Sequence, residues 1–139
     1  MSNESVERYK RLLSAIPPKV RAASFVALDK YADLMMKSMQ AMVPRDPVEG
    51  TFLGPSIRKE EDISRLRVTL RAGGQTTTKA IHEGQSGSYD YANAQEFGTA
   101  KMSANPFFWP SYRLYRKAMR SAVKRNMRKA VKESFPGAT

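Results

Sequence analysis

Few side chains in this 139-residue sequence have the types and spacing that catalysis requires. His82 is the single histidine, and no neighbouring residues form a general acid–base pattern with it, so we interpret it as a surface or hairpin residue. Glu60, Glu61 and Asp62 are adjacent, which is typical of a solvated turn or the start of a helix. The sequence has no cysteine and no phosphate-binding loop, metal-ligand spacing or nucleophile elbow. We therefore expect a protein that is not an enzyme and has no catalytic residues, metal or cofactor.

The most unusual composition lies in residues 91–110, YANAQEFGTAKMSANPFFWP, which hold three of the six Phe and the only Trp. Three consecutive aromatic residues stand between two prolines: Pro106, Phe107, Phe108, Trp109 and Pro110. Two roles are open for this large apolar group. It could fill the core beneath the last helix, or it could form contacts between subunits.

A second short motif lies just upstream of the aromatic run: Glu96, Phe97, Gly98 and Thr99. Glu96 has two open interpretations, an ion pair with a basic residue of the same or a neighbouring copy, and a solvated acid. Gly98 and Thr99 are expected to form the turn that positions the following loop, with Gly98 in a backbone conformation that other residues resist. The pattern of residues 89–99 leaves a strand and a short helical turn both open, and it favours strand or extended structure at residues 95–97.

The positive charge of the chain is concentrated at its C-terminal end. Residues 1–100 carry 14 Lys/Arg and 12 Asp/Glu, a net charge of +2, whereas residues 101–139 carry ten Lys/Arg and one acid, a net charge of +9. The two parts add up to the +11 of the whole chain. Such a segment suggests contact with a polyanion, contact with an acidic protein surface, or a solvated helix face.

The hydrophobic pattern predicts two long helices that flank a small sheet. A short first helix ends at Pro17-Pro18, and a 3.6-residue period then predicts a long helix at 19–42. A basic amphipathic helix is expected at 111–134, with many of its cations on the outer surface. Six of them are candidates for contact with DNA or a partner: Arg113, Arg116, Lys117, Arg120, Lys124 and Arg128.

The middle of the chain predicts the sheet. Alternation from Leu66 onward, followed by Gly73-Gly74, predicts an antiparallel strand pair within 63–82. Residues 44–57 are rich in Pro and Gly and predict an irregular connector, and residues 84–88 predict a loop. The expected fold is α+β, a single domain over 1–139 with a small antiparallel sheet packed against the two long helices.

Residues 91–119 resemble the neck or tail-completion (minor tail component) family of long-tailed bacteriophages. That family has a Glu-Phe-Gly-Thr element, a short polar loop, and then Pro-Phe and a second Pro that open a long C-terminal helix. The matching residues here are 96–99 and 106–110. A weaker match extends upstream through Pro44, residues 50–53 and Ser56-Ile57, so that the resemblance covers about residues 20–134.

The resemblance implies a structural protein of the virion at the head–tail junction, present in the host cytoplasm before assembly. Such proteins form a homo-oligomeric ring around the DNA channel, a hexamer or a dodecamer, and join the tail to the head. The implied partners are other copies of the chain, other neck and tail proteins, and genomic double-stranded DNA through non-specific contact. No membrane partner is expected, because no apolar run approaches the roughly 18 residues of a membrane helix.

Two alternatives remain beside this interpretation. A tail-terminator or head-closure ring component belongs to the same assembly and has similar requirements. A stand-alone basic DNA-binding protein is the alternative from a different class, favoured by the basic helix, although the sequence contains no helix-turn-helix, zinc-finger or RNA-recognition signature.

Overall fold

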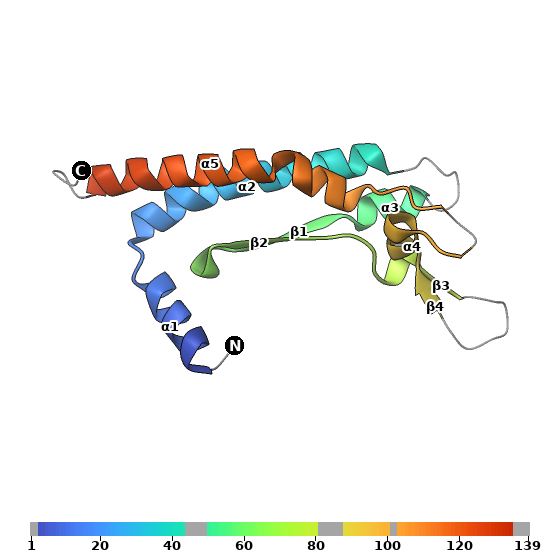
Figure 1. Cartoon of the computed structure of the whole chain (residues 1–139), viewed down its shortest axis with the longest axis horizontal. Helices are drawn as coiled ribbons and strands as arrows, with labels where there is room; N and C mark the ends of the chain where they lie inside the picture. Colours follow the sequence, from blue (N-terminus) through green and yellow to red (C-terminus); the bar gives the residue numbers. More distant parts are fainter. Residues whose placement is uncertain (1–2, 44–49, 81–87, 101–102, 135–139) are drawn as a thin grey trace.

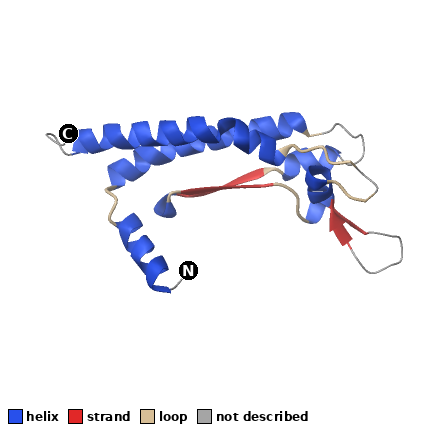
Figure 2. Ribbon diagram, viewed as in Figure 1, coloured by secondary structure: helices blue, strands red, loops and turns tan. Residues whose placement is uncertain are grey.

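The computed structural model describes residues 3–43, 50–80, 88–100 and 103–134 (Figure 1). The described chain combines helices with short antiparallel strand pairs, which confirms the expected α+β fold (Figure 2). The elements follow in this order: α1 Asn3–Ser14, α2 Pro18–Met42, α3 Gly50–Ser56, β1 Arg58–Asp62, β2 Arg67–Arg71, β3 Thr78–Ala80, β4 Ser88–Asp90, α4 Tyr91–Phe97 and α5 Phe108–Ser134.

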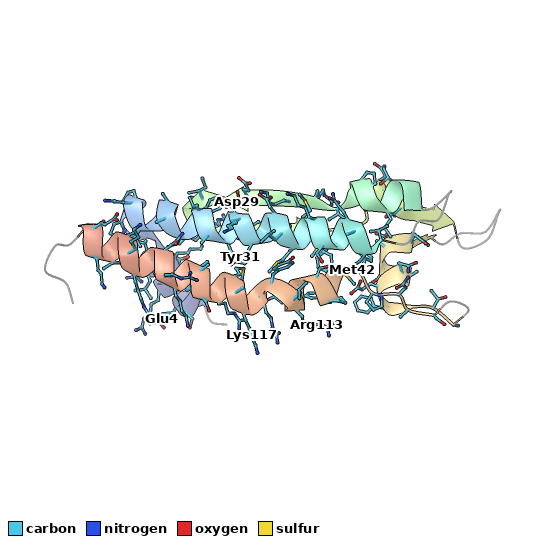
Figure 3. All side chains as sticks on the ribbon, turned by 90° about the horizontal axis from the view of Figure 1, so that it is seen from above. Glu4, Asp29, Tyr31, Met42, Arg113 and Lys117 are labelled. Atoms are coloured by element: carbon cyan, nitrogen blue, oxygen red, sulfur yellow. The ribbon has the colours of Figure 1, made fainter. Side chains whose placement is uncertain are left out.

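The two long helices form the spine of the molecule. α2 and α5 lie side by side and run in opposite directions (Figures 1 and 3). Near one end Asn126 Nδ2 donates to the Ala23 carbonyl at 3.1 Å, and near the other Ser111 Oγ donates to Ser38 Oγ at 2.9 Å. The prediction of a helix at 19–42 agrees with α2 within one residue. α5 ends at the predicted residue but begins three residues earlier than predicted.

The strand prediction was right for β2 and wrong for its partner. β2 pairs with the preceding strand β1, with Arg58 opposite Arg71 and Asp62 opposite Arg67, and a short 3₁₀ turn joins them. The segment expected to pair with β2 instead contributes β3, which pairs with β4. The three adjacent acids, Glu60 to Asp62, therefore lie in a strand and not in a solvated turn or helix start.

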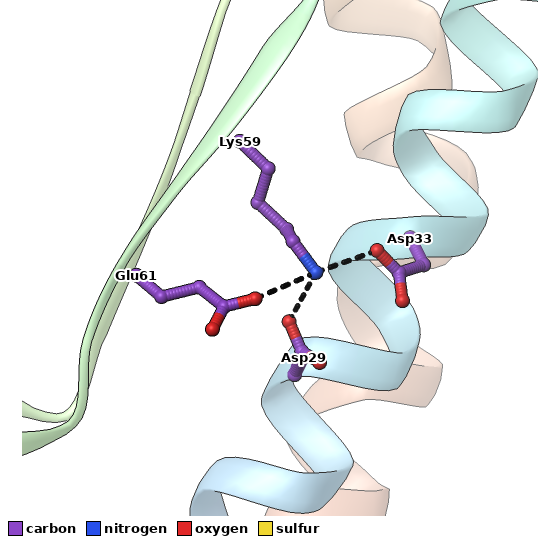
Figure 4. A network of polar contacts seen from close by, with 4 residues as sticks. All are labelled: Asp29, Asp33, Lys59 and Glu61. Atoms are coloured by element: carbon purple, nitrogen blue, oxygen red, sulfur yellow. Dashed lines mark hydrogen bonds and ion pairs between the residues drawn. The ribbon is translucent and has the colours of Figure 1, made fainter.

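Lys59 explains why so polar a segment forms a strand at this place. Its Nζ lies 2.5 Å from Asp29 Oδ1, 2.7 Å from Asp33 Oδ1 and 2.9 Å from Glu61 Oε1 (Figure 4). Burial alone would lower the pKa of Lys59, but the hydrogen bonds to these three carboxylates outweigh it and raise the pKa above its ordinary value of 10.5. The ion pairs of Lys59 with Asp29 and Asp33 connect β1 to α2.

The hydrophobic core lies where the end of α2 meets α3, α4 and the start of α5. Its most buried large side chains are Phe107, Met39 and Leu53, each at most 1% exposed. The predicted irregular connector was wrong for residues 50–56, which form α3 and supply Leu53 to this core. The predicted extended structure at residues 95–97 was also wrong. These residues complete the helix α4, whose N-cap Asp90 accepts a hydrogen bond from the Ala92 N–H at 2.9 Å.

At the opposite end of the spine, α1 projects away from the other elements (Figure 1). α1 ends before Pro17, as the sequence predicted, and Pro17 caps α2, whose first residue is Pro18. Tyr9 and Leu12 on this helix are 63% and 62% exposed. None of the helices described here is long and apolar enough to cross a bilayer. His82 and the predicted loop at 84–88 fall largely outside the described residues.

Candidate functional site

The two motifs that stand out in the sequence meet at the start of α5. The Glu96 carboxylate accepts three backbone hydrogen bonds from this helix start. Oε2 accepts from the N–H groups of Phe107 at 2.8 Å and Phe108 at 2.9 Å, and Oε1 accepts from Trp109 N–H at 3.0 Å. Residues 11 to 13 positions away along the chain are thus joined through one side chain.

This contact satisfies the N-terminus of a 27-residue helix. The first N–H groups of a helix have no partner inside it, and they present the positive end of the helix dipole. Residues 107 to 109 each have a backbone N–H, and Glu96 accepts a hydrogen bond from all three. Pro110 has no N–H and needs no acceptor. Helix α5 can therefore begin at Phe108 and not at the predicted Ser111.

Glu96 is only 6% exposed, so the expectation of a solvated acid was wrong. Its partners in this structure are backbone amides, whereas the sequence had suggested a basic side chain. The same motif ends the unpredicted helix α4, and Gly98 has the unusual backbone conformation that the sequence predicted for it. Gly98 has φ 78° and ψ 172°, a conformation that favours glycine, and its N–H donates to the Ala94 carbonyl at 2.7 Å.

The loop between the two motifs is fastened at its far end. The Asn105 N–H donates to the Gln95 carbonyl at 2.8 Å, and Gln95 Nε2 donates to the Asn105 carbonyl at 3.3 Å. Thr99 and Pro106 are exposed on this loop. Because these bonds hold Asn105 next to Gln95, the backbone of the residues that follow Asn105 lies close to the Glu96 carboxylate.

The aromatic residues divide between the core and the surface. Phe107 is 1% exposed and packs in the core, whereas Phe108 is half-buried and Trp109 is 44% exposed. Edge-to-face contacts connect Phe107 to Phe108 at 6.4 Å and Phe108 to Trp109 at 5.3 Å between ring centroids. Of the two predicted roles, Phe107 has the core role, and Trp109 remains available for contact with another molecule.

A groove opens beside this cluster. It has a volume of about 370 Å³. Its lining includes three polar residues, Asp90, Asn93 and Glu96, and three aromatic residues, Phe97, Phe108 and Trp109. We call it the aromatic groove. Phe97 stands at its rim with 66% of its surface exposed. The groove therefore combines apolar side chains with two carboxylates, and its lining among the described residues includes no Lys or Arg.

Asp90 is a part of this site that sequence reasoning missed. Its Oδ1 accepts from Thr77 Oγ1 at 2.6 Å and its Oδ2 accepts from Gly74 N–H at 3.0 Å, in addition to capping α4. A Cβ on Gly73 would lie 2.5 Å from this carboxylate, so the close approach requires glycine there. An Asp directly before a short apolar segment is a helix N-cap signal that could have revealed α4.

The cations of α5 lie mainly on its outer side. Arg113 and Lys117 are directed away from α2 (Figure 3), and Arg120, Lys124 and Arg128 are also exposed, whereas Arg116 is half-buried. The sequence-based set omitted Arg125 and Lys129. Together with Lys124, Arg128 and Lys132, these two residues surround a depression in the surface. We call this group of five cations the basic ridge. Their i, i+4 spacing was the available signal.

The basic ridge has no neutralising carboxylates close to it. Among the described residues, no carboxylate oxygen lies within 4.0 Å of the five cations of the ridge. Glu133, which follows Lys132 in the sequence, pairs instead with Lys19 on α2 at 3.6 Å. Cations kept at this density on one helix face can attract a polyanion or an acidic protein surface.

Comparison with models of protein families, with curated proteins and with solved structures finds no match to this chain.

Proposed function

We propose that this chain is a structural subunit of the phage head–tail junction, a neck or tail-completion protein that assembles as a ring around the DNA channel. The observation that carries the proposal is the meeting of the two sequence motifs at one place. Glu96 belongs to the Glu-Phe-Gly-Thr element, and its carboxylate holds the start of the helix that the Pro-Phe element opens.

This geometry gives the resemblance a physical basis. A glutamate placed before a glycine turn and a helix that begins twelve residues later are both needed to build one buried cap. The same arrangement leaves Phe97 and Trp109 exposed on a fixed scaffold. Exposed aromatic residues on rigid elements are typical of protein–protein contacts. A ring subunit needs such contacts with its neighbours and does not need a catalytic site.

The basic ridge supports a second candidate, a stand-alone DNA-binding protein. In a ring, the same cations would face passing DNA loosely or would meet an acidic surface of a neighbouring protein. Binding to DNA through phosphates alone is weak, sensitive to salt and independent of base sequence. A stand-alone regulator would instead bind one duplex sequence tightly.

Size-exclusion chromatography with light scattering, with and without duplex DNA, tests these alternatives. The variant is the triple substitution of Lys124, Arg125 and Arg128 by Gln. The matched control is the triple substitution of Arg65, Arg67 and Arg71 by Gln, which removes the same charge from exposed positions on the β1–β2 hairpin.

If the basic ridge faces DNA, the variant still forms rings. A plot of the logarithm of its DNA-binding constant against the logarithm of salt concentration should then be shallower than that of the control, by about three in slope. If the ridge contacts a neighbouring copy, the variant stays folded but fails to form rings. A monomer that binds one duplex sequence at nanomolar concentration and physiological salt would contradict the ring proposal and favour the regulator.

A further inference from the structure

α1 is an amphipathic helix that leaves large apolar side chains exposed. Tyr9 and Leu12 are both more than 60% exposed and, with the half-buried Val6, lie on one side of the helix. Charged residues occupy the other side, and there Lys10 pairs with Glu7 at 3.1 Å. An isolated helix of 12 residues is marginal in water, because too few hydrogen bonds follow its nucleation. Such a helix gains stability when its apolar side is covered.

The aromatic groove is a second exposed apolar surface, and it lies at the opposite end of the molecule from α1 (Figure 1). Its rim residue Phe97 and its wall residue Trp109 are 66% and 44% exposed. A chain with a net charge of +11 offers few acidic surfaces, yet two carboxylates, Asp90 and Glu96, line this groove. The groove is thus suited to an apolar segment that also carries positive charge.

The accessible surface of the chain is large enough for contacts with other copies. It amounts to 9938 Å², whereas a compact monomer of 15.6 kDa exposes about 7,200 Å². The difference of about 2,700 Å² exceeds the roughly 800 Å² that each partner buries in an interface of standard size. The elongated shape therefore leaves enough surface for each copy to contact two neighbours.

We propose that α1 of one copy docks in the aromatic groove of the next copy of this chain. Tyr9 and Leu12 insert against Phe97 and Trp109, which removes the exposed apolar side chains of both surfaces from water. Arg8 and Arg11 have no carboxylate within 4.0 Å among the described residues. Arg8, one turn before Leu12, borders the apolar side of α1 and can meet the negative charge that Asp90 and Glu96 bring to the groove, whereas Arg11 lies on the charged side.

The positions of the two surfaces determine the kind of assembly. Because helix and groove lie at opposite ends, the contact joins two different surfaces, and every copy retains one free helix or groove until the assembly closes. This inference rests on the proposed ring function, and it identifies the contact that would hold neighbouring subunits together.

Sedimentation velocity of the full chain tests the contact with one variant on each surface. Leu12→Glu places a charge on α1, and Phe97→Glu places one at the groove. Val26→Glu is the matched control, because Val26 is 64% exposed on α2 and belongs to neither surface. Circular dichroism verifies that each variant stays folded, which is expected since all three side chains are mostly exposed.

We expect each of the two interface variants to associate at least about 30-fold more weakly than the wild type, and the control to associate normally. The decisive step mixes Leu12→Glu with Phe97→Glu. One variant retains an intact groove and the other an intact α1, so the mixture should form a 1:1 dimer that cannot grow further.

Three results would overturn the inference. If either interface variant assembles as the wild type does, or if the mixture stays monomeric, the contact between α1 and the groove is wrong while a ring built through other surfaces remains. If the wild-type chain itself stays monomeric at all concentrations, the ring function and this contact both fail. The two failures are therefore distinguishable.

Discussion

Replacing Glu96 is the sharpest perturbation of the folded chain, because three backbone N–H groups depend on its carboxylate. In Glu96→Ala all three lose their acceptor, and the Phe107 N–H lies in a buried setting. In Glu96→Gln one oxygen remains to accept two of the bonds. The third position then holds an NH₂ group that faces another donor.

The expected loss of stability follows from these contacts. A hydrogen bond to a charged acceptor contributes about 1.5–3 kcal/mol, so three independent bonds would set an additive limit of about 4.5–9 kcal/mol. Water can replace part of this at Trp109, which is 44% exposed. We therefore expect Glu96→Ala to lower the free energy of unfolding by about 4 kcal/mol and Glu96→Gln by about 2 kcal/mol.

Urea and thermal unfolding of the monomeric chain measure this loss. Trp109 is the only tryptophan and donates one of the three bonds, so its fluorescence reports on the start of α5, while circular dichroism reports on the helices overall. For a chain of this length, about 3.5 °C of Tm corresponds to 1 kcal/mol, which predicts shifts of about 14 °C and 7 °C.

Glu60→Gln is the matched control, since Glu60 is 55% exposed and pairs with Arg71 at the surface. It should change the free energy of unfolding by less than about 0.5 kcal/mol. If Glu96→Gln unfolds at the same urea concentration as the wild type and the control, the cap does not stabilise α5, and the physical link between the two motifs is lost.

Four further substitutions have defined outcomes in unfolding followed by circular dichroism, which does not depend on the single tryptophan. Phe107→Ala should cost about 3–5 kcal/mol because the ring is fully buried, and Trp109→Ala should cost less than about 1 kcal/mol; equal losses would contradict this division. Gly98→Val should cost about 2 kcal/mol, because its backbone conformation is nearly restricted to glycine, and an unchanged Tm would contradict that strain. Lys59→Met should cost about 2 kcal/mol, less than for a fully buried pair because its partners stay partly exposed. Since the pKa of Lys59 is raised in the fold, the difference in unfolding free energy between the wild type and Lys59→Met should stay constant up to about pH 10.5 and become smaller at higher pH. A difference that becomes larger as the pH rises would contradict the raised pKa.

The long helices could be predicted because their signals are local and repeated. The apolar period of α2, the prolines at its start and the amphipathic pattern of α5 are all contained in the segments themselves. The early start of α5 could not be predicted in this way, because it depends on a carboxylate twelve residues upstream. A helix terminus that is satisfied by a distant side chain carries no local signature.

The sheet shows the same limit. β2 alternates and was predicted, but its partner β1 is a run of charged residues with no apolar face. β1 is held by Lys59, whose partners on α2 lie 26 and 30 residues away. A pattern based on hydrophobic alternation therefore selects the wrong neighbour. α4 was missed because seven residues are too few to establish a helical period.

The ring at the head–tail junction is tested most directly by electron cryomicroscopy of the assemblies that the full chain forms in solution. We expect closed rings of six or twelve copies, with adjacent subunits joined through unlike surfaces and a central channel that admits duplex DNA. Particles limited to single chains, or to dimers in which one surface meets itself across a two-fold axis, would contradict the proposed function.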